Sequence, residues 1–586
     1  MSVSLVGATS NCLIATQQCC TRMAAAIGPI LTELGGTRVQ RRSGMRKQPN
    51  RGRSAPIAHL LRKFAITLST CVFCTIAAVA ETPRDTLVLG WDISPVSTLD
   101  PDVNNSGTAA GILSNVCDPL VFRDYEDATK FVPGLVRSWT VGKDRLTWRF
   151  SIRPEIRFAS GRNMTAQDVV WSIQRALRLQ NGGINGESLR RIGYQTSDAE
   201  THFRVLDNFT FEIRAKNQLA EIVFLEAFER IAVLDRISVL SQQQNGDLGS
   251  RWLSTTSACA GPFSVTQWNA NNVIILTKNK QPYWRHTIAI ERVVIRHIPQ
   301  SASQRLLLEK GDIDVALNVN PADLPAIRRN PRLRLVIRQS PNIFFLGLNQ
   351  KHEILRKPQI REAFRNLIDY GALAQTFLRD IAIIRQDFVP AGAFGAIPPS
   401  RPFNLDVAKS RRLLAEAGFP KGFSIELVVR SQPPQIDVAQ SIQASAAQVG
   451  IDIRIRSMSD AMLYSVLRSR TFQLCLTGFT FTPDASTSAG SFALNLDNGD
   501  NSKRNSAAWM TAWDVGRDSN ELVQQAQVEQ DTNKRQLIYY RLQEGQRKNA
   551  PLIPIYQLNR VFVVSSAVAV LKTNGVNVFY PTAVKR

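Results

Sequence analysis

Histidine is scarce in this sequence, and the familiar catalytic motifs are absent. There are 5 His and 8 Cys among 586 residues. The pair His352–Glu353 is not followed by the second His that a zinc protease requires. The G-x-S-x-G elbow, the GK[ST] phosphate loop and the G-x-G-x-x-G loop are also missing. We therefore expect no enzyme, no metal site and no cofactor. A secreted hydrolase with a triad assembled from distant residues remains a remote alternative.

Long hydrophobic runs are nearly absent too, which excludes a polytopic membrane protein. The exception is the uncharged stretch Phe64–Ala80, which follows two basic residues and ends in Ala-Val-Ala. Small residues at those positions suit signal peptidase. We predict a signal peptide cut after Ala80, a periplasmic mature chain, and translation from Met1, Met23 or Met45. The alternative is a membrane anchor, because the stretch lies at the short end of what spans a bilayer.

Acidic residues are too few to balance the basic ones. The chain has 71 Lys and Arg against 48 Asp and Glu, a formal net charge of +23. Such an excess raises the question of a nucleic-acid partner. Part of it lies in residues 1–80, which hold ten basic residues and a single acid, Glu33. Elsewhere the basic residues are dispersed, as on a solvated surface, and we expect no nucleic-acid partner.

Three cysteines remain after the predicted cleavage: Cys117, Cys259 and Cys475. Cys475 lies in the apolar run Leu474–Leu476, which is typical of a core. In an oxidising compartment the simplest arrangement is one disulfide and one buried thiol. Cys117 and Cys259 are therefore the candidate disulfide, although sequence alone does not establish the pairing.

Strand-like and helix-like segments alternate along the mature chain. With 44% hydrophobic and 20% charged residues, this indicates a folded α/β or α+β protein of three or four domains or lobes. Thr86–Leu89 and Leu146–Ile152 have strand patterns, and the second alternates with period two. Thr165 and Asp168 resemble a capping box, and apolar residues at helical spacing follow them.

The second half of the chain has a β-α-β progression. Asp406 is expected to cap a helix that ends at Gly418. The strand Ile425–Val429 comes next. A further helix ends at Gly450, and the alternating segment Ile451–Ile455 follows as another strand.

Two segments near the C-terminal end lack this clear alternation. The polar stretch Ser486–Asn505 contains Ser, Asn, Asp and Gly without a period, which predicts a long loop. Glu521–Asn549 has the composition of a surface helix and is predicted to form a single long one.

Several short segments, taken together and in order, resemble the family 5 extracytoplasmic solute-binding proteins of ABC importers, the oligopeptide, dipeptide and nickel receptors. Together they span essentially all of residues 81–586. The segments are Cys117–Val121, Val132–Trp139, Leu146–Arg153, Ala260–Phe263, Gly311–Ala316, Leu348–Asn349, Arg361–Ala363, Ala415–Gly418 and Pro551–Tyr556.

The resemblance implies an α/β, two-lobed periplasmic-binding-protein fold of class II, the large type with an extra domain, with mixed sheets and strands that cross between the lobes at a hinge. After residues 1–80, which form the N-terminal extension and signal peptide, it implies this division of the chain: 81–124 in lobe I, 125–245 as domain II, 246–345 in lobe I, 346–550 as lobe III and 551–586 in lobe I.

The resemblance also implies how such a protein works. Ligand bridges two closing lobes, and the closed form docks on an inner-membrane permease served by an ATPase. We expect a monomeric receptor for a peptide or another peptide-like polar organic solute. A receptor of the same fold for a sugar, an opine or a metal chelate is the alternative.

In peptide-binding members a carboxylate of lobe III holds the α-ammonium of the ligand, within a segment of type G-W-x-x-D. The corresponding segment here is Gly478–Ala485. Thr482 occupies the place of the acid, and a hydroxyl cannot supply the charge-assisted hydrogen bond that a buried ammonium requires. Asp484 is the remaining acid, with a turn-forming role as the alternative. From this segment we expect four ligand contacts: Phe479, Thr480, Thr482 and Asp484.

Three further residues complete the predicted site. Arg430, at a strand end, falls close to where dipeptide-binding members place a carboxylate-anchoring arginine, although arginines in such places are often solvated. Trp509 and Trp513 follow the polar stretch four residues apart. They either stack on the ligand or pack within lobe III.

Overall fold

The computed structural model describes residues 82–124, 130–179, 183–280, 285–398, 402–502, 505–574 and 576–586. Contacts divide the chain into residues 1–78 and residues 79–586, and the description below concerns the second unit. The predicted signal peptide, its cleavage site after Ala80 and the translation start lie outside the described residues.

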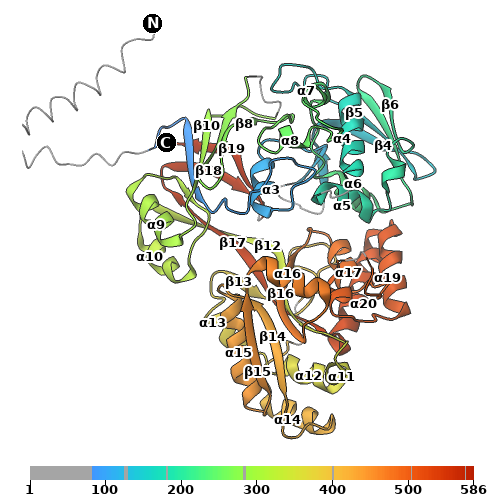
Figure 1. Ribbon diagram of the computed structural model, residues 1–586, viewed down its shortest axis with the longest axis vertical. Coiled ribbons are helices and arrows are strands. Elements are labelled where there is room, and N and C mark those ends of the chain that lie inside the picture. Colours follow the sequence, from blue (N-terminus) through green and yellow to red (C-terminus); the bar gives the residue numbers. More distant parts are fainter. Residues whose placement is uncertain are drawn as a thin grey trace, which may run out of the picture. The chain divides into compact units, whose positions relative to one another are not determined.

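Two long strands run through the middle of an eleven-stranded sheet. They are β12 (Leu333–Leu348) and β17 (Leu552–Ser565), which pair antiparallel along most of their lengths. Near one end of this ladder the outer edge of β17 pairs with β11 (Val315–Ala316), and near the other end the outer edge of β12 pairs with β16 (Leu474–Thr480). We call β12 and β17 the crossing strands, because they join the two halves of the sheet (Figure 1). They confirm the predicted strand connection between lobes.

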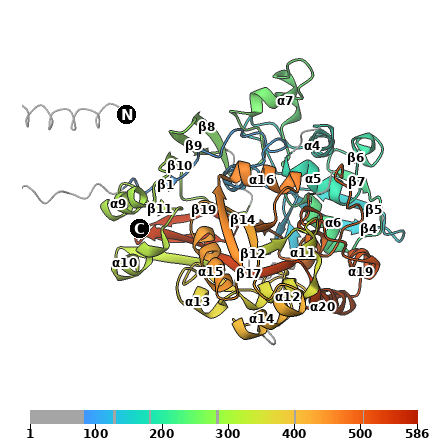
Figure 2. The same cartoon turned by 60° about the horizontal axis from the view of Figure 1, so that its bottom comes forward.

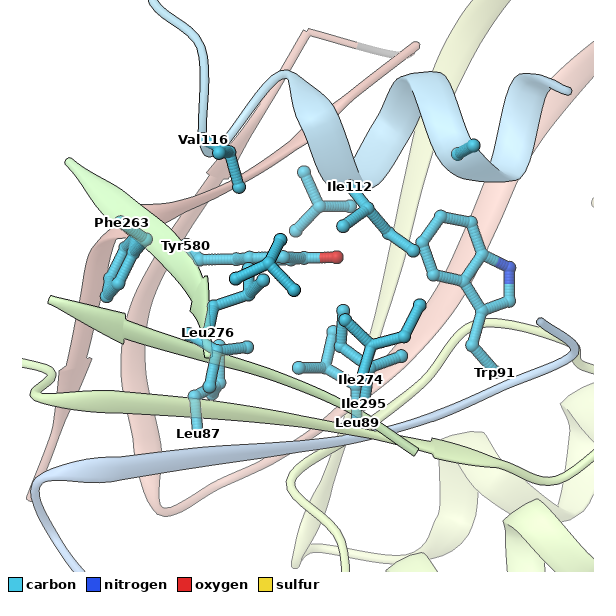
Figure 3. Packing of buried hydrophobic residues seen from close by; sticks show 14 of the residues in the cluster. Leu87, Leu89, Trp91, Ile112, Val116, Phe263, Ile274, Leu276, Ile295 and Tyr580 are labelled. Atoms are coloured by element: carbon cyan, nitrogen blue, oxygen red, sulfur yellow. The ribbon is translucent and has the colours of Figure 1, made fainter. Parts of the chain in front are cut away.

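The half of the sheet beyond β11 carries a large apolar core. Its strands are β1 (Thr86–Trp91), β10 (Arg292–His297), β9 (Val273–Lys278) and β8 (Phe263–Asn269). Figure 3 shows leucines and isoleucines of β1, β9 and β10 pointing toward Ile112 of α3 (Gly107–Leu113), with Tyr580 between them. The predicted strand Thr86–Leu89 is confirmed, and its burial fixes β1 beneath α3.

A separate four-stranded antiparallel sheet follows the order β4 (Val136–Val141), β5 (Thr147–Ile152), β7 (Thr210–Arg214) and β6 (Phe203–Asp207). Alternate residues of β5 are buried, as its period-two pattern predicts. The neighbouring helix α4 (Ala166–Arg178) begins with the expected capping box, in which the Thr165 N–H donates to Asp168 Oδ2 over 2.9 Å.

Short elements complete this part of the chain and the connection to the crossing strands. They are β2 (Val121–Arg123), β3 (Phe131–Pro133), α5 (Ile184–Arg191), α6 (Glu221–Phe228), α7 (Arg236–Ser241), α8 (Ser250–Leu253), α9 (Ser301–Lys310) and α10 (Leu324–Arg329).

The other half of the sheet contains the predicted β-α-β progression. Asp406 caps α14 (Val407–Glu416) by accepting a hydrogen bond from the Lys409 N–H over 2.8 Å. β14 (Ser424–Arg430) and β15 (Asp452–Met458) lie parallel and are joined by α15 (Gln435–Ala447). The remaining elements here are α11 (Glu353–Arg356), α12 (Pro358–Asn366), α13 (Tyr370–Gln375), β13 (Ala382–Ile384) and α16 (Asp460–Ser469), and the hairpin β18 (Val568–Thr573) and β19 (Val578–Lys585) follows β17.

Two of the sequence predictions are wrong in this region. The stretch 486–505 is not all loop, because Asp484 caps the helix α17 (Ala485–Phe492), whose small residues pack tightly in a core. The stretch 521–549 is not one helix. It contains the end of α19 (Arg517–Val528) and the whole of α20 (Thr532–Asn549), which starts anew at the cap Asp531. The short helix α18 (Ala507–Met510) lies between α17 and α19.

The cysteines behave as expected from their positions. Cys117 and Cys259 form a disulfide with Cα atoms 4.9 Å apart, and Cys475 is a buried free thiol. Burial raises the pKa of that thiol to about 12. Within the described part of the chain, every helix is too short or too polar to cross a membrane.

Candidate functional site

A cavity of about 3020 Å³ lies between the two halves of the sheet, beside the crossing strands. On one side its wall includes Trp91 at the end of β1, the loop 95–108 and parts of α5 and α6. On the other side the wall comes from β16, α16 and the start of α17. Pockets for drug-sized molecules usually hold about 300–1,000 Å³, so this cavity has room for a larger solute than that.

Four of the predicted site residues line the cavity: Arg430, Phe479, Thr480 and Thr482. Arg430 ends β14, and its Nε lies 2.5 Å from Asp460 Oδ1. Thr482 is hydrogen-bonded through Oγ1 to Thr487 Oγ1 at 2.8 Å, so its hydroxyl is already engaged within the protein. Direct contact of these residues with a ligand stays a prediction.

Asp484 does not line the cavity. It is fully buried, and Arg535 of α20 donates to both of its oxygens, over 2.8 Å to Oδ2 and 2.6 Å to Oδ1. The Ser486 N–H donates to Oδ1 as well. Burial by itself would lower the pKa of Arg535, but the charge of Asp484 outweighs it and raises that pKa. The carboxylate is therefore neutralised inside the protein, as structural ion pairs are.

The two tryptophans also lie away from the cavity wall. Trp509 is 2% exposed, and its Nε1 donates to the Gly499 carbonyl over 2.9 Å. The Arg470 guanidinium lies 4.9 Å from its ring centroid. Trp513 is half-buried against the core around Phe492. Of the two roles considered for this pair, the structure places both in lobe packing.

A charge cluster on the opposite wall was not predicted. Arg123 of β2 pairs with two acids of the α6 region, through Nε with Glu229 Oε2 at 2.8 Å and through Nη2 with Glu226 Oε2 at 3.2 Å. All three residues line the cavity. Burial raises the pKa of Glu226 to about 7 against the opposing effect of Arg123. The sequence signal was a glutamate within the apolar helix Glu221–Phe228.

The crossing strands supply a second unpredicted group. Arg338 of β12 and Arg560 of β17 both line the cavity. The Arg560 guanidinium carbon lies 5.8 Å from the ring centroid of Trp91. Nothing in the local sequence marks these two arginines as inward-facing, because β12 and β17 also carry polar residues that do not line the cavity, such as Arg334 and Asn559.

The cavity is bounded on one side by a direct contact between α19 and the segment before α6. The Ala220 N–H donates to the Gln527 carbonyl over 2.8 Å, and Gln530 Nε2 donates to the Leu219 carbonyl over 3.1 Å. This contact brings α19 close to α6, as Figure 2 shows. The described conformation therefore has the two sides of the cavity in contact.

The polar groups of this cavity suit the binding of a polar solute. No group of three or more His, Cys, Asp or Glu side chains is placed to hold a metal ion anywhere in the described ranges. The wall instead alternates aromatic rings, hydroxyls and arginines. Such walls orient a polar solute by hydrogen bonds and ion pairs while burying its apolar parts.

Comparison with known proteins supports this description. The family model described as "Bacterial extracellular solute-binding proteins, family 5 Middle" matches residues 130–500. The glutathione-binding protein GsiB of Salmonella paratyphi A is 25% identical over 376 residues, which are 62% of this chain and 68% of that protein.

Solved structures with the same fold include two with bound ligands. DppA from Helicobacter pylori in complex with the peptide STSA has a TM-score of 0.72 at 21% identity and covers 86% of this chain and 98% of its own. MoaA from A. tumefaciens R10 in complex with mannopinic acid has a TM-score of 0.72 at 20% identity, with 86% and 100% covered. At these identities the likeness concerns the fold.

Proposed function

Because the chain belongs to family 5 of the bacterial extracellular solute-binding proteins, we propose that it captures a peptide or a peptide-like polar organic solute for an ABC importer. Family membership and the relatives, which are named as binding proteins, support a periplasmic solute-binding receptor. Its partners in this proposal are an inner-membrane permease with its ATPase. The protein acts as a monomer after a signal peptide is removed behind Ala80.

We assign residues 81–124, 246–345 and 551–586 to lobe I, 346–550 to lobe III and 125–245 to domain II. The topology supports this division, since only the crossing strands link the two halves of the large sheet. A ligand that touches both halves favours the closed state by its difference in affinity for the closed and open forms. The permease then recognises the closed form, and no bond is made or broken.

The observation that carries the proposal is the cavity itself. It holds about 3020 Å³ and takes its wall from both sides of the crossing strands. A peptide matches it better than a single sugar or amino acid, because several residues are needed to fill that volume. Arg430, Phe479, Thr480 and Thr482 are positioned on this wall as ligand contacts.

One observation favours the second candidate, a non-peptide solute such as an opine, a sugar or a metal chelate. The acid expected to hold an α-ammonium, Asp484, is occupied by Arg535. A peptide must therefore place its ammonium on another acid, and Glu226 is the buried one on the wall. A solute without an ammonium has no such requirement.

A thermal-shift screen separates the two candidates. The purified protein is unfolded and refolded to remove carried-over ligand, then mixed with di-, tri- and tetrapeptides, their N-acetylated forms, sugars, opines and metal chelates. A ligand that binds only the native state raises the Tm. We expect free peptides to raise it and N-acetylation to remove the effect. If only an opine, a sugar or a chelate raises the Tm, that solute and not a peptide is the ligand.

A further inference from the structure

Arg338 and Arg560 lie directly opposite each other in the antiparallel ladder of the crossing strands. Residues paired in this way project from the same face of a sheet, with Cβ atoms about 5 Å apart. Both side chains line the cavity. Two positive charges are therefore held side by side at the point where the two halves of the protein are joined. Like charges in this arrangement destabilise a sheet.

Neither guanidinium has an acidic partner in the part of the chain that the structure describes. Arg338 donates to the carbonyl of its neighbour Ile337, over 3.0 Å. Arg560 is half-buried, and its Nε is fully buried without a hydrogen-bond partner. Burial lowers the pKa of Arg560, an effect that Tyr580 offsets in part. Two of the buried arginines elsewhere in the described residues, Arg175 and Arg535, are each paired with carboxylates, whereas the buried Arg365 donates to backbone carbonyls.

The surroundings of Arg560 hold its guanidinium in place. The Trp91 ring lies beneath it with a carbon-to-centroid distance of 5.8 Å, within the range of a cation–π contact. Trp91 is itself 7% exposed and packed in the core of β1. In the same stretch of β12, the ladder shifts register between Gln339 and Ile343, and Asn342 Oδ1 is buried without a donor.

We infer that Arg338 and Arg560 form an anion subsite that binds a carboxylate of the captured solute at the junction of the crossing strands. A planar guanidinium suits the two oxygens of a carboxylate, and one anion between two cations removes their repulsion. In a peptide this carboxylate is the C-terminal one. The inference rests on the proposed receptor function but not on the solute being a peptide.

The subsite also lies at the connection between the two halves of the large sheet. One arginine lies on each crossing strand, and these two strands connect the halves that enclose the cavity. An anion that bridges them binds at the place where any relative movement of the halves must bend the sheet. Because the two arginines are already neighbours in one ladder pair, the anion favours the closed state only through the contacts that the rest of the solute makes with the two halves.

The first experiment uses acetate, so that it is independent of the transported solute. Saturation-transfer NMR of acetate is measured with the ligand-stripped protein, Arg560→Gln, Arg338→Gln and the control Arg454→Gln, which removes an exposed charge on β15 outside the cavity. We expect a signal with wild type and Arg454→Gln that falls at least about fivefold in the other two. Equal signals in all four proteins would overturn the inference.

Two additions keep the result decisive. Arg338→Gln alters an exposed side chain, so it tests the subsite even if Arg560→Gln does not fold. Line broadening of inorganic phosphate in ³¹P NMR is measured in parallel. Broadening that depends on Arg560, without a corresponding acetate signal, would show a phosphate site and overturn the carboxylate assignment.

The second experiment uses trialanine and its C-terminal amide in calorimetric titrations. With wild type, we expect the amide to bind with roughly 30-fold lower affinity than the acid, because amidation removes a charge-assisted hydrogen bond. With Arg560→Gln, we expect the acid and the amide to bind with nearly equal affinity. Equal affinities of acid and amide for wild type would contradict the inference. If neither peptide binds while acetate binding still depends on Arg560, the peptide proposal fails and the anion subsite stands.

Discussion

Glu226 carries a carboxyl whose charge changes near neutral pH. Burial raises its pKa from 4.5 to about 7 in the folded protein, despite the nearby Arg123. The folded state thus keeps a proton that the unfolded chain has lost between about pH 4.5 and 7. Folding takes up that proton, so the free energy of unfolding contributed by this residue falls as the pH rises through this range.

We predict that Glu226→Gln removes this fall, because an amide does not titrate. Thermal unfolding of wild type and Glu226→Gln is compared from pH 4.5 to 8. Relative to the variant, wild type should lose stability toward neutral pH, by up to roughly 3 kcal/mol. Parallel stability curves for the two proteins would mean that Glu226 is ionised throughout.

For Arg560 we predict that a substitution raises the stability of the ligand-free protein. An unpaired charge with a buried Nε costs free energy in the folded state. Arg560→Met keeps the packing against Trp91 and removes that cost. We expect the Tm of the ligand-free variant to rise by about 2 °C while acetate binding is lost. A lower Tm would indicate that Arg560 stabilises the fold rather than serving a ligand.

At the residue scale, four of the seven predicted site residues line the cavity: Arg430, Phe479, Thr480 and Thr482. Arg430 ends β14, and Thr482 lies in the loop after β16. A local motif is enough to predict that both line the cavity. Asp484 was misplaced because its partner, Arg535, lies 51 residues away on α20. Arg338 and Arg560 are 222 positions apart, and only the register of the ladder brings them together.

Among the elements, α4 packs beside the four-stranded sheet and also holds a loop of the cavity wall through buried ion pairs. Arg175 on this helix is fully buried and pairs with Asp100 at 2.7 Å and with Asp102 at 2.6 Å. The loop that carries both acids contributes Pro101 and Asn104 to the cavity wall. The ion pairs therefore fix a wall of the cavity to α4.

We predict that Arg175→Ala destabilises the protein by about 3–5 kcal/mol, since two buried carboxylates lose their compensating charge. Arg178→Ala is the matched control on the same helix, because its pair with Glu200 is largely exposed and worth about 1 kcal/mol or less. Denaturant unfolding measures both. Equal effects of the two substitutions would contradict the structural role given to Arg175.

The disulfide between Cys117 and Cys259 ties the chain after α3 to the strand segment before β8, across 142 residues. Constraining so long a loop stabilises a folded protein by about 2–5 kcal/mol. We expect the Cys117→Ser/Cys259→Ser double variant to have a lower Tm than wild type. A reductant should lower the Tm of wild type toward that value and leave the variant unchanged. A reductant effect in the variant would point to another cause.

Element prediction succeeded where the signal is local. The capping box at Thr165 and the stop at Gly418 depend on a few adjacent residues, and both are found. It failed at α17, because the Ser, Thr and Gly residues of this segment have weak helical preferences, whereas Ala485, Ala489 and Phe492 pack in a core that the sequence does not reveal. It failed again at residues 529–531, where an Asp cap outweighs the helical composition on either side.

For the whole molecule, the crossing strands determine the spatial order of the strands in the large sheet. β17 lies near the C-terminus yet pairs with β11, β12 and β13. No local pattern reveals such long-range pairing, since each strand alone is only an apolar segment. The two-lobed arrangement was predicted from the ordered family segments rather than from periodicity. The structure confirms the two-lobed arrangement, so the resemblance to the family extends to the fold.

We propose that this protein captures a solute and returns it unchanged. Native mass spectrometry of the ligand-stripped protein, incubated overnight with an equimolar mixture of tri- and tetrapeptides, tests it most directly. The account predicts a one-to-one complex, from which the bound peptide is released with its mass intact. Fragments of the peptides would reveal an enzyme. A complete absence of peptide adducts, with an adduct formed by an opine or sugar mixture, would contradict the peptide assignment.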